Sequence, residues 1–188
     1  MTDLRSAPVP PLRDDDHVRG PAETPVTFFY ADFTCPRCVV EALRLRESNA
    51  RVVFRHFALK ARHPRSVPLA LSAEAASRQG AFWEFHDSLY EDQGRIDDPH
   101  LWARIEALGL DVQRFEADRR DPAIAERVRR DVREALRAGA TTTPTMAATG
   151  LRNTSHHHGS SFTPDQTMKS GMVSPVSSPT SFRCMAST

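Results

Sequence analysis

Long apolar runs are absent from this sequence. No stretch approaches the roughly 20 apolar residues that a membrane-spanning helix requires. Residues 1–20 are polar, acidic and rich in proline, so they lack the apolar central region of a secretory signal peptide. We therefore expect no membrane span and a cytoplasmic location, where thiols are kept reduced and disulfides tend to be transient or catalytic.

An excess of charge of either sign is also missing. The 188 residues carry a formal net charge of +1, so no strong electrostatic field directs the chain to nucleic acid or to anionic lipid. Lysine is nearly absent, because Lys60 and Lys169 are the only two. Hydrophobic residues make up 39% of the chain, which suffices for the core of one domain with tails.

The composition changes twice along the chain and predicts three zones. Residues 1–24 contain four prolines and an acidic run from Asp14 to Asp16, and we expect a flexible N-terminal arm. Residues 25–152 carry the periodic apolar patterns of a folded domain. Residues 153–188 are rich in Ser, Thr, His, Met and Pro without such a period, so we expect a disordered or aberrant tail.

The folded zone opens with a strand, a helix and a second strand. Residues 26–33 form a short apolar and aromatic run that predicts a buried strand. A helix should follow, capped by the Thr34 hydroxyl and with Pro36 in its first turn. Residues 51–57 predict the second strand, so the three elements form a βαβ unit with a right-handed crossover.

A helical block comes next. Apolar periodicity and glycine stops predict helices over residues 67–79, 81–91, 99–108, a short helix around Phe115, and 122–138. Asp111 and Asp121 stand where they can cap the last two helices. Glu126, Arg130 and Glu134 recur at four-residue intervals and predict an exposed ladder of ion pairs along the last helix.

Two cysteines stand at the junction of the first strand and the first helix. Helical spacing puts the sulfurs of Cys35 and Cys38 on the same side of the helix, within reach of a disulfide. Unpaired amide groups at the helix start favour a Cys35 thiolate, and Arg37 adds a positive charge while Pro36 stiffens the turn. A C-x-x-C at this junction is typical of a thioredoxin-like redox site, with Cys35 as the nucleophile and Cys38 as the resolving thiol.

The same cysteine pair is compatible with a structural zinc site or with two inert core thiols. Zinc needs two more ligands, and only Cys184 and the run His156 to His158 are available, without a zinc-finger spacing. Inert core thiols are the least favoured of the three interpretations. The histidines His56, His63 and His86 have no spacing that marks a general base, so we expect ordinary packing or surface roles for them.

Four segments occur in a characteristic order: DHVRGPAETPVTFFYADFTCPRC, VVFRHFAL, HPRSVPLALSAEAASRQGAFWEFHDSLYEDQ and TTTPT. Together they resemble the compact bacterial DsbA-like branch of the thioredoxin superfamily, whose domains occur alone or fused to some sodium/proton antiporters. The resemblance covers roughly residues 16–145. It implies an α/β thioredoxin fold with a helical insertion after the second strand.

The resemblance also implies an activity. Members of this family carry out thiol–disulfide exchange on protein or small thiol and disulfide substrates, together with a redox partner, and need no cofactor and no metal. The family's cis-proline loop corresponds to Thr143 and Pro144, which pack against the cysteine pair and offer the Thr143 backbone to an extended substrate. Oxidase, reductase and isomerase share these residues, so the direction of exchange is left open.

The sequence departs from the family in two places. Arg37 stands where the family usually has an aromatic residue or histidine, and we expect a more oxidising disulfide from the added cation. After Thr145 the family's apolar strand, partner strand and final helix give way to MAATGLRNTSHHHGSS, so the usual C-terminal strand and helix are expected to be missing. The alternative to an enzyme is therefore a non-catalytic thioredoxin-like binding module or a defective remnant. A glutathione-using or isomerase relative is disfavoured by the intact dithiol.

Overall fold

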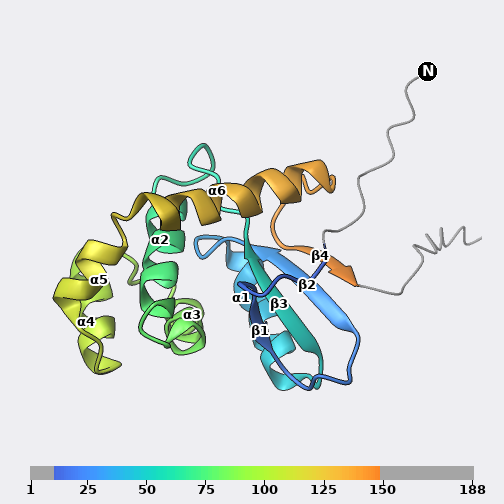
Figure 1. The fold of residues 1–188 in the computed structure, drawn as a ribbon, viewed down its shortest axis with the longest axis horizontal. Coiled ribbons are helices and arrows are strands. Elements are labelled where there is room, and N and C mark those ends of the chain that lie inside the picture. Colours follow the sequence, from blue (N-terminus) through green and yellow to red (C-terminus); the bar gives the residue numbers. More distant parts are fainter. Residues whose placement is uncertain (1–10, 149–188) are drawn as a thin grey trace, which may run out of the picture. The chain divides into compact units, whose positions relative to one another are not determined.

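The computed structural model describes residues 11–148. Within that range the chain forms one four-stranded sheet in the order β1-β3-β2-β4, and six helices accompany it (Figure 1). The strands are β1 (His17–Arg19), β2 (Val26–Ala31), β3 (Arg51–His56) and β4 (Thr145–Ala148). The expected α/β fold class is thereby confirmed.

The centre of the sheet is the predicted βαβ unit. Strands β2 and β3 pair in parallel, from Val26 opposite Arg51 to Ala31 opposite His56, and helix α1 (Pro36–Glu47) connects them. Strands β1 and β4 pair antiparallel with β3 and β2, one on each side of the central pair. The carboxyl ends of β2 and β3 therefore meet at the same edge of the sheet, and the cysteine pair follows directly on one of them.

The helical insertion lies between β3 and β4, as expected. Its members are α2 (Ser66–Ser77), α3 (Phe82–Glu91), α4 (Asp98–Ala107), α5 (Val112–Asp118) and α6 (Pro122–Arg137). The side chains of Asp111 and Asp121 accept hydrogen bonds from the amides of Arg114 and Ala123, which confirms both predicted caps.

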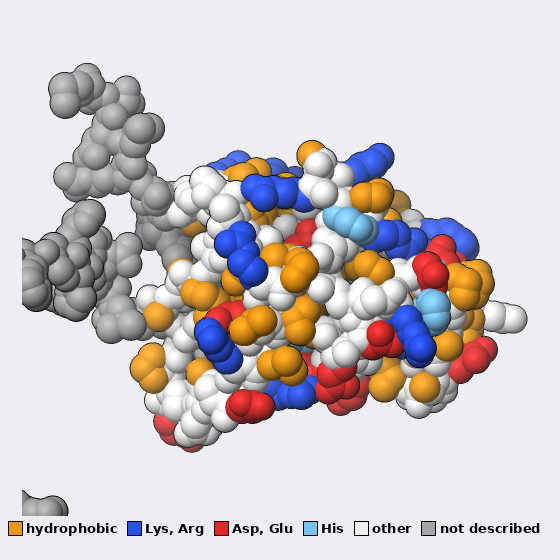
Figure 2. All heavy atoms as spheres, turned by 180° about the vertical axis from the view of Figure 1, so that it is seen from behind, with side chains coloured by type: hydrophobic (Ala, Val, Ile, Leu, Met, Phe, Trp, Pro, Cys, Tyr) orange, Lys and Arg blue, Asp and Glu red, His pale blue; other side chains and the backbone are white. Residues whose placement is uncertain are grey.

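Both faces of the sheet are buried. Side chains alternate along β2, so Phe29 faces one core together with Phe54 and the α1 residue Ala42, while Phe28 faces a second core with Ala135 of α6. Burial on both faces explains why this strand has a continuous apolar sequence instead of an alternating one. The described surface carries both signs of charge side by side on the face in Figure 2, in line with the small net charge.

The expectation of a flexible arm through residue 24 is wrong for residues 11–24. Strand β1 lies within this segment and pairs Val18 with Val53 of β3. The indole of Trp83 donates a hydrogen bond to the Val18 carbonyl at 3.2 Å, and the Asp16 side chain is buried in an ion pair with Arg55. A three-residue strand is too short to show a period, and its partners lie far along the chain, so the local pattern gave no signal.

Two finer expectations are also corrected. The strand ends at Ala31 instead of residue 33, and Cys35 occupies the N-cap of α1 without a side-chain cap. The Thr34 hydroxyl donates to the Asp32 carboxylate at 2.8 Å instead of capping the helix. The Asp32 carboxylate, two residues away, binds the hydroxyl in place of the helix amides.

The predicted ladder of Glu126, Arg130 and Glu134 does not form on α6. Glu126 pairs within the helix with Arg129 and Arg133, whereas the other two residues pair with distant segments. Arg130 pairs with Asp15, and Glu134 pairs with Arg13 at 2.8 Å. Both partners belong to the segment before β1, so the acidic run and the basic helix face neutralise each other across the fold.

Several expectations concern residues outside the described range. Outside it lie residues 1–10 of the arm and the region of the family's last strand and helix. The tail 153–188, with Cys184 and His156 to His158, lies outside it as well. Between residues 11 and 148, no helix combines the length and the apolar character needed to cross a bilayer. The cytoplasmic location stays a prediction.

Candidate active site

Strand β2 and helix α1 present the two cysteines at one edge of the sheet. Cys35 is the N-cap of α1 and Cys38 lies in its first turn, where the Cys38 amide donates to the Cys35 carbonyl at 3.0 Å. Pro36 occupies the first helical position, where a missing amide hydrogen is not needed. The sequence therefore places both sulfurs at the positive end of the helix dipole.

The loop before Cys35 is held by Asp32. Its buried carboxylate accepts hydrogen bonds from the amide and the hydroxyl of Thr34, both at 2.8 Å, and its carbonyl accepts from the Cys35 amide at 3.1 Å. These bonds fix the turn from strand to helix and the direction of the Cys35 side chain. Sequence reasoning did not single out Asp32; its position three residues before the cysteine in a turn was the available signal.

The two thiols have opposite environments. Both are free, but Cys35 is partly exposed, whereas Cys38 is completely buried. Burial alone would raise the pKa of the Cys35 thiol, but hydrogen bonding with Thr143, with Cys38 and with the Arg37 amide outweighs it, so that pKa lies below its ordinary value. Burial raises the pKa of the Cys38 thiol far above its ordinary value.

The Thr143–Pro144 loop reaches the cysteine pair from the other end of the domain. The peptide bond is cis, as the resemblance implies, and the Cys35 thiol donates to the Thr143 carbonyl across 3.4 Å. The two residues are 108 positions apart in the sequence. The loop thus contacts the nucleophilic sulfur directly, and the amide donors at the start of α1 add to the stabilisation of the thiolate.

A groove of about 260 Å³ opens beside Cys35. Its apolar wall is formed by Phe57 and Leu59, and its remaining lining is Asp32, Thr34, Cys35, Pro36, Arg37, Arg62, His63, Thr142 and Thr143. The structure therefore brings all the expected site residues except Cys38 and Pro144 to the wall of one groove, with Cys38 directly behind Cys35. Arg62 and His63 were not expected there, because only the fold brings the segment after β3 to this edge.

Comparison with known protein families gives a match to the DSBA-like thioredoxin domain over residues 65–163. Among curated proteins, the chain is 43% identical over 158 residues to the Na(+)/H(+) antiporter NhaA 1 of Salinispora arenicola, covering 81% of this chain and 24% of that protein. It is 37% identical to the Na(+)/H(+) antiporter NhaA of Herminiimonas arsenicoxydans, over 80% of this chain and 25% of that protein. The chain thus spans about a quarter of the length of the curated relatives it matches.

Solved structures share the fold. A thioredoxin-like oxidoreductase from Silicibacter pomeroyi superimposes with a TM-score of 0.64 at 23% identity, covering 74% of this chain and 83% of that one. The thiol-disulfide exchange protein alpha-DsbA2 from Wolbachia pipientis gives a TM-score of 0.61 at 17% identity, covering 70% and 74%. At these identities the similarity establishes the fold alone.

Proposed function

This chain belongs to the DsbA-like thioredoxin family, and from that premise we propose that it is a thiol–disulfide oxidoreductase that acts through Cys35 and Cys38. The observation that carries the proposal is the asymmetry of the pair. One thiol is accessible with a lowered pKa, and the other is buried behind it with a raised pKa. Exchange needs one thiolate that is both reachable and a good leaving group, and a second thiol that substrate cannot reach.

The oxidising direction starts from a Cys35–Cys38 disulfide. A substrate thiolate attacks the Cys35 sulfur, the disulfide bond breaks, and Cys38 leaves as a thiolate that takes up a proton. A second substrate thiolate attacks the mixed disulfide at the substrate sulfur, and Cys35 leaves as a thiolate. The substrate is then oxidised by two electrons and the protein is reduced. The lowered pKa of Cys35 makes it the better leaving group in this last step.

The reducing direction uses the same groups in reverse order. The Cys35 thiolate attacks a substrate disulfide, and Cys38 resolves the mixed disulfide after losing its proton. The raised pKa of Cys38 opposes this deprotonation at neutral pH. The same raised pKa makes Cys38 a poor leaving group in the first oxidising step, so it favours neither direction. The lowered pKa of Cys35 stabilises the reduced protein as a thiolate and therefore favours the oxidising direction among the three that the family implies.

The groove beside Cys35 is the proposed substrate site. Its wall includes the Thr143 backbone, which can pair with an extended peptide as an added strand does. Phe57 and Leu59 offer apolar contact for a side chain next to the reacting sulfur. Arg37 and Arg62 add positive charge at the same groove, so a substrate with acidic neighbours is the better electrostatic match.

Disulfide exchange on a model peptide with two cysteines tests the proposal. The oxidised protein should convert the dithiol peptide to its disulfide, and Cys35→Ser should abolish the reaction. Reduced Cys38→Ser, given the disulfide form of the peptide, should accumulate a mixed disulfide visible by mass spectrometry, because Cys35 attacks the peptide disulfide and no second thiol of the protein resolves the product. The double variant, checked for native circular dichroism, is the matched control. Wild-type protein that is folded yet inactive in both directions would instead support the non-catalytic binding module.

A further inference from the structure

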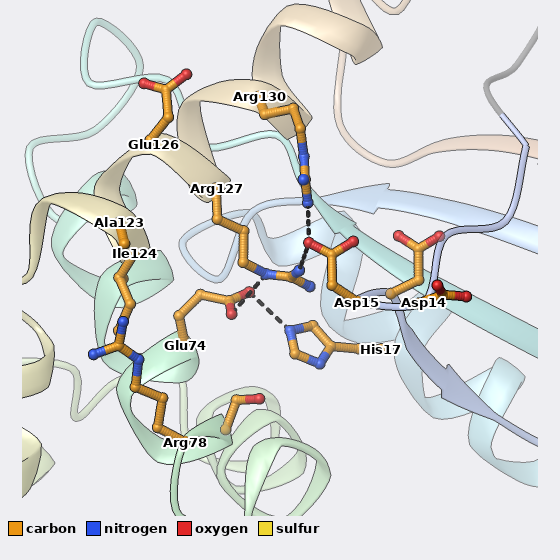
Figure 3. Close-up of a pocket in the computed structure, with 12 residues that line it drawn as sticks. Asp14, Asp15, His17, Glu74, Arg78, Ala123, Ile124, Glu126, Arg127 and Arg130 are labelled. Atoms are coloured by element: carbon orange, nitrogen blue, oxygen red, sulfur yellow. Dashed lines mark hydrogen bonds and ion pairs between the residues drawn. The ribbon is translucent and has the colours of Figure 1, made fainter.

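Two histidines and one glutamate converge on the side of the domain that carries the N-terminal segment. His17 lies in β1, His56 ends β3, and Glu74 lies in the middle of α2. Glu74 Oε1 is 2.8 Å from His17 Nε2 and 2.8 Å from His56 Nε2. The three atoms all lie within 4.8 Å of one another, and Figure 3 shows His17 and Glu74 pointing toward each other.

We propose that His17 Nε2, His56 Nε2 and Glu74 Oε1 bind one divalent transition-metal ion of the zinc class. Two imidazoles and one carboxylate are a common protein ligand set for such ions. Ligand atoms around a tetrahedral zinc at about 2.0 Å are about 3.3 Å apart, so the 2.8 Å pairs need to separate only by about half an ångström. A water molecule from the adjoining pocket would complete the coordination.

The three side chains are held in place by the fold. The His17 ring stacks on Phe82 with centroids 3.4 Å apart, and the His56 ring packs edge-on against Phe54 at 5.1 Å. Their side chains are 10% and 1% exposed, and that of Glu74 is 5% exposed. Such restraint lowers the entropy lost when a metal fixes its ligands.

Arg127 supports the carboxylate from behind. Its Nε lies 2.7 Å from Glu74 Oε2, as Figure 3 shows, and Oε1 is left for the two imidazoles. An outer partner on the second oxygen is the usual way in which a ligating carboxylate is oriented. Arg127 also brings a positive charge close to the site, but it pairs with Asp15 at 2.6 Å, which offsets that charge.

The ionised groups around the site have a net negative charge, which favours a bound cation. A continuous network of ion pairs joins Glu74 to the segment before β1, to Arg55 and to α6. It contains five carboxylates and four guanidinium groups, namely Asp15, Asp16, Glu74, Asp131 and Glu134 with Arg13, Arg55, Arg127 and Arg130. With neutral imidazoles the network therefore carries one unbalanced negative charge.

A pocket gives an ion access to the site. It has a volume of about 750 Å³, and its lining includes His17, Glu74, Asp15, Arg127 and Arg130. The site is separate from the groove at Cys35, whose lining shares none of these residues. A bound ion would tie β1 to β3 and α2, so its expected effect is on stability rather than on thiol exchange.

The alternative to a metal site is a simple hydrogen-bonded triad. In that case each imidazole keeps its proton on Nε2 and donates it to Glu74, whereas coordination needs a free lone pair on Nε2 and the proton on Nδ1. The triad and the metal site therefore differ in the tautomer of His17 and His56, which nitrogen NMR measures directly.

The test is a titration with Co²⁺ and Zn²⁺. The protein carries Ala in place of His156, His157 and His158 and Ser in place of Cys184, and Cys35 and Cys38 are kept oxidised, so these other metal-binding groups are removed. We expect one equivalent of Co²⁺ with visible d–d absorption, displacement by Zn²⁺, and a higher midpoint of thermal unfolding with Zn²⁺. Glu74→Gln and His17→Gln should each lose at least about tenfold in affinity, because one ligand is removed. His100→Gln, which removes an exposed histidine beside Asp97, should bind as before.

Three results would overturn the proposal. The first is no binding at about equimolar metal, and the second is equal binding by the Glu74→Gln and His17→Gln proteins. The third result applies if those variants do not fold. It is that the Nε2 protons of His17 and His56 remain in the parent protein at saturating Zn²⁺.

Discussion

Arg55 and Asp16 form a two-point ion pair from which solvent is excluded. The Arg55 Nε and terminal nitrogen donate to the two carboxylate oxygens at 2.9 and 2.7 Å, and both side chains are 0% exposed. The guanidinium also donates to the Pro11 carbonyl and lies over the Phe28 ring, 4.6 Å from its centroid. A segment whose sequence reads as a flexible arm therefore supplies the counter-charge for the core of the sheet.

Asp16→Asn should destabilise the domain by about 3–5 kcal/mol, because it removes the two-point partner of the buried Arg55 charge and leaves only Glu134, at 3.6 Å, as a counter-charge. Urea unfolding followed by tryptophan fluorescence measures the loss. The matched control is Asp14→Asn, two residues earlier in the same acidic run, which is exposed and should change stability by less than about 0.5 kcal/mol. Equal effects of the two substitutions would show that the segment before β1 is not anchored through Asp16.

Cys35 should react with iodoacetamide much faster than Cys38 at neutral pH. Cys35 is accessible with a lowered pKa, whereas Cys38 is buried with a raised pKa. Mass spectrometry of peptides after short alkylation times gives both rates, and Cys38→Ser is the control for cross-talk between the thiols. Similar rates in the folded wild-type protein would contradict the assignment of Cys35 as nucleophile.

Arg37 should affect the Cys35 pKa mainly through its backbone. Its amide is among the hydrogen bonds that lower that pKa, while its side chain is exposed. Arg37→Gln should therefore raise the pKa only slightly, and salt at about 0.5 M should remove most of the difference by screening. Thiolate absorbance against pH checks this. A large rise that persists in salt would support the stronger cation effect expected from the sequence.

The domain should lose stability as the pH falls from about 6.5 toward 4. Burial lowers the pKa of His86 to about 4, so between these values the unfolded chain binds a proton that the folded protein does not. The free energy of unfolding is therefore highest above pH 6.5 and falls by about 3 kcal/mol on the way to pH 4 because of this residue alone. Unfolding free energies across this range should fall less steeply for His86→Phe than for wild type.

Gly20 should not tolerate alanine. Its φ is +105°, and an added Cβ would lie 2.2 Å from the carbonyl oxygen of Ala50. Gly20→Ala should cost at least about 2 kcal/mol through strain and displacement of the backbone between β1 and β2. Gly94→Ala is the control, because its added Cβ would approach only the Asp92 side chain at 3.9 Å. Thermal unfolding of the two variants should differ clearly.

The sequence predicted those parts of the fold that have local signals. The βαβ unit follows from two apolar runs around a helix, and Asp111 and Asp121 mark helix starts because a cap acts within three residues. The cysteine pair was recognisable for the same reason, since its spacing and its place at a helix start are both local. The family resemblance, rather than any local pattern, brought Thr143 to this site.

The buried charges could not be predicted in the same way. Glu74 sits in an alanine-rich helix where a single acid normally faces solvent, and Arg55 interrupts a strand that is otherwise apolar. Each is buried because of partners on other elements, His17 and His56 for Glu74 and Asp16 for Arg55. Pairing between distant segments leaves no period in the sequence, so only the fold reveals it.

The contact between Arg13 and α6 has a consequence for the order of events during synthesis. Arg13 pairs with Asp131 and Glu134, which follow it by 118 and 121 residues. The segment before β1 is thus the first described part of the chain to leave the ribosome. Arg55, the partner of Asp16, follows it by 39 residues, but the α6 partners of Arg13 emerge only when the domain is nearly complete. We expect it to remain accessible to chaperones and proteases throughout elongation and to dock as a late folding step, a delay inherent in contacts of such sequence separation.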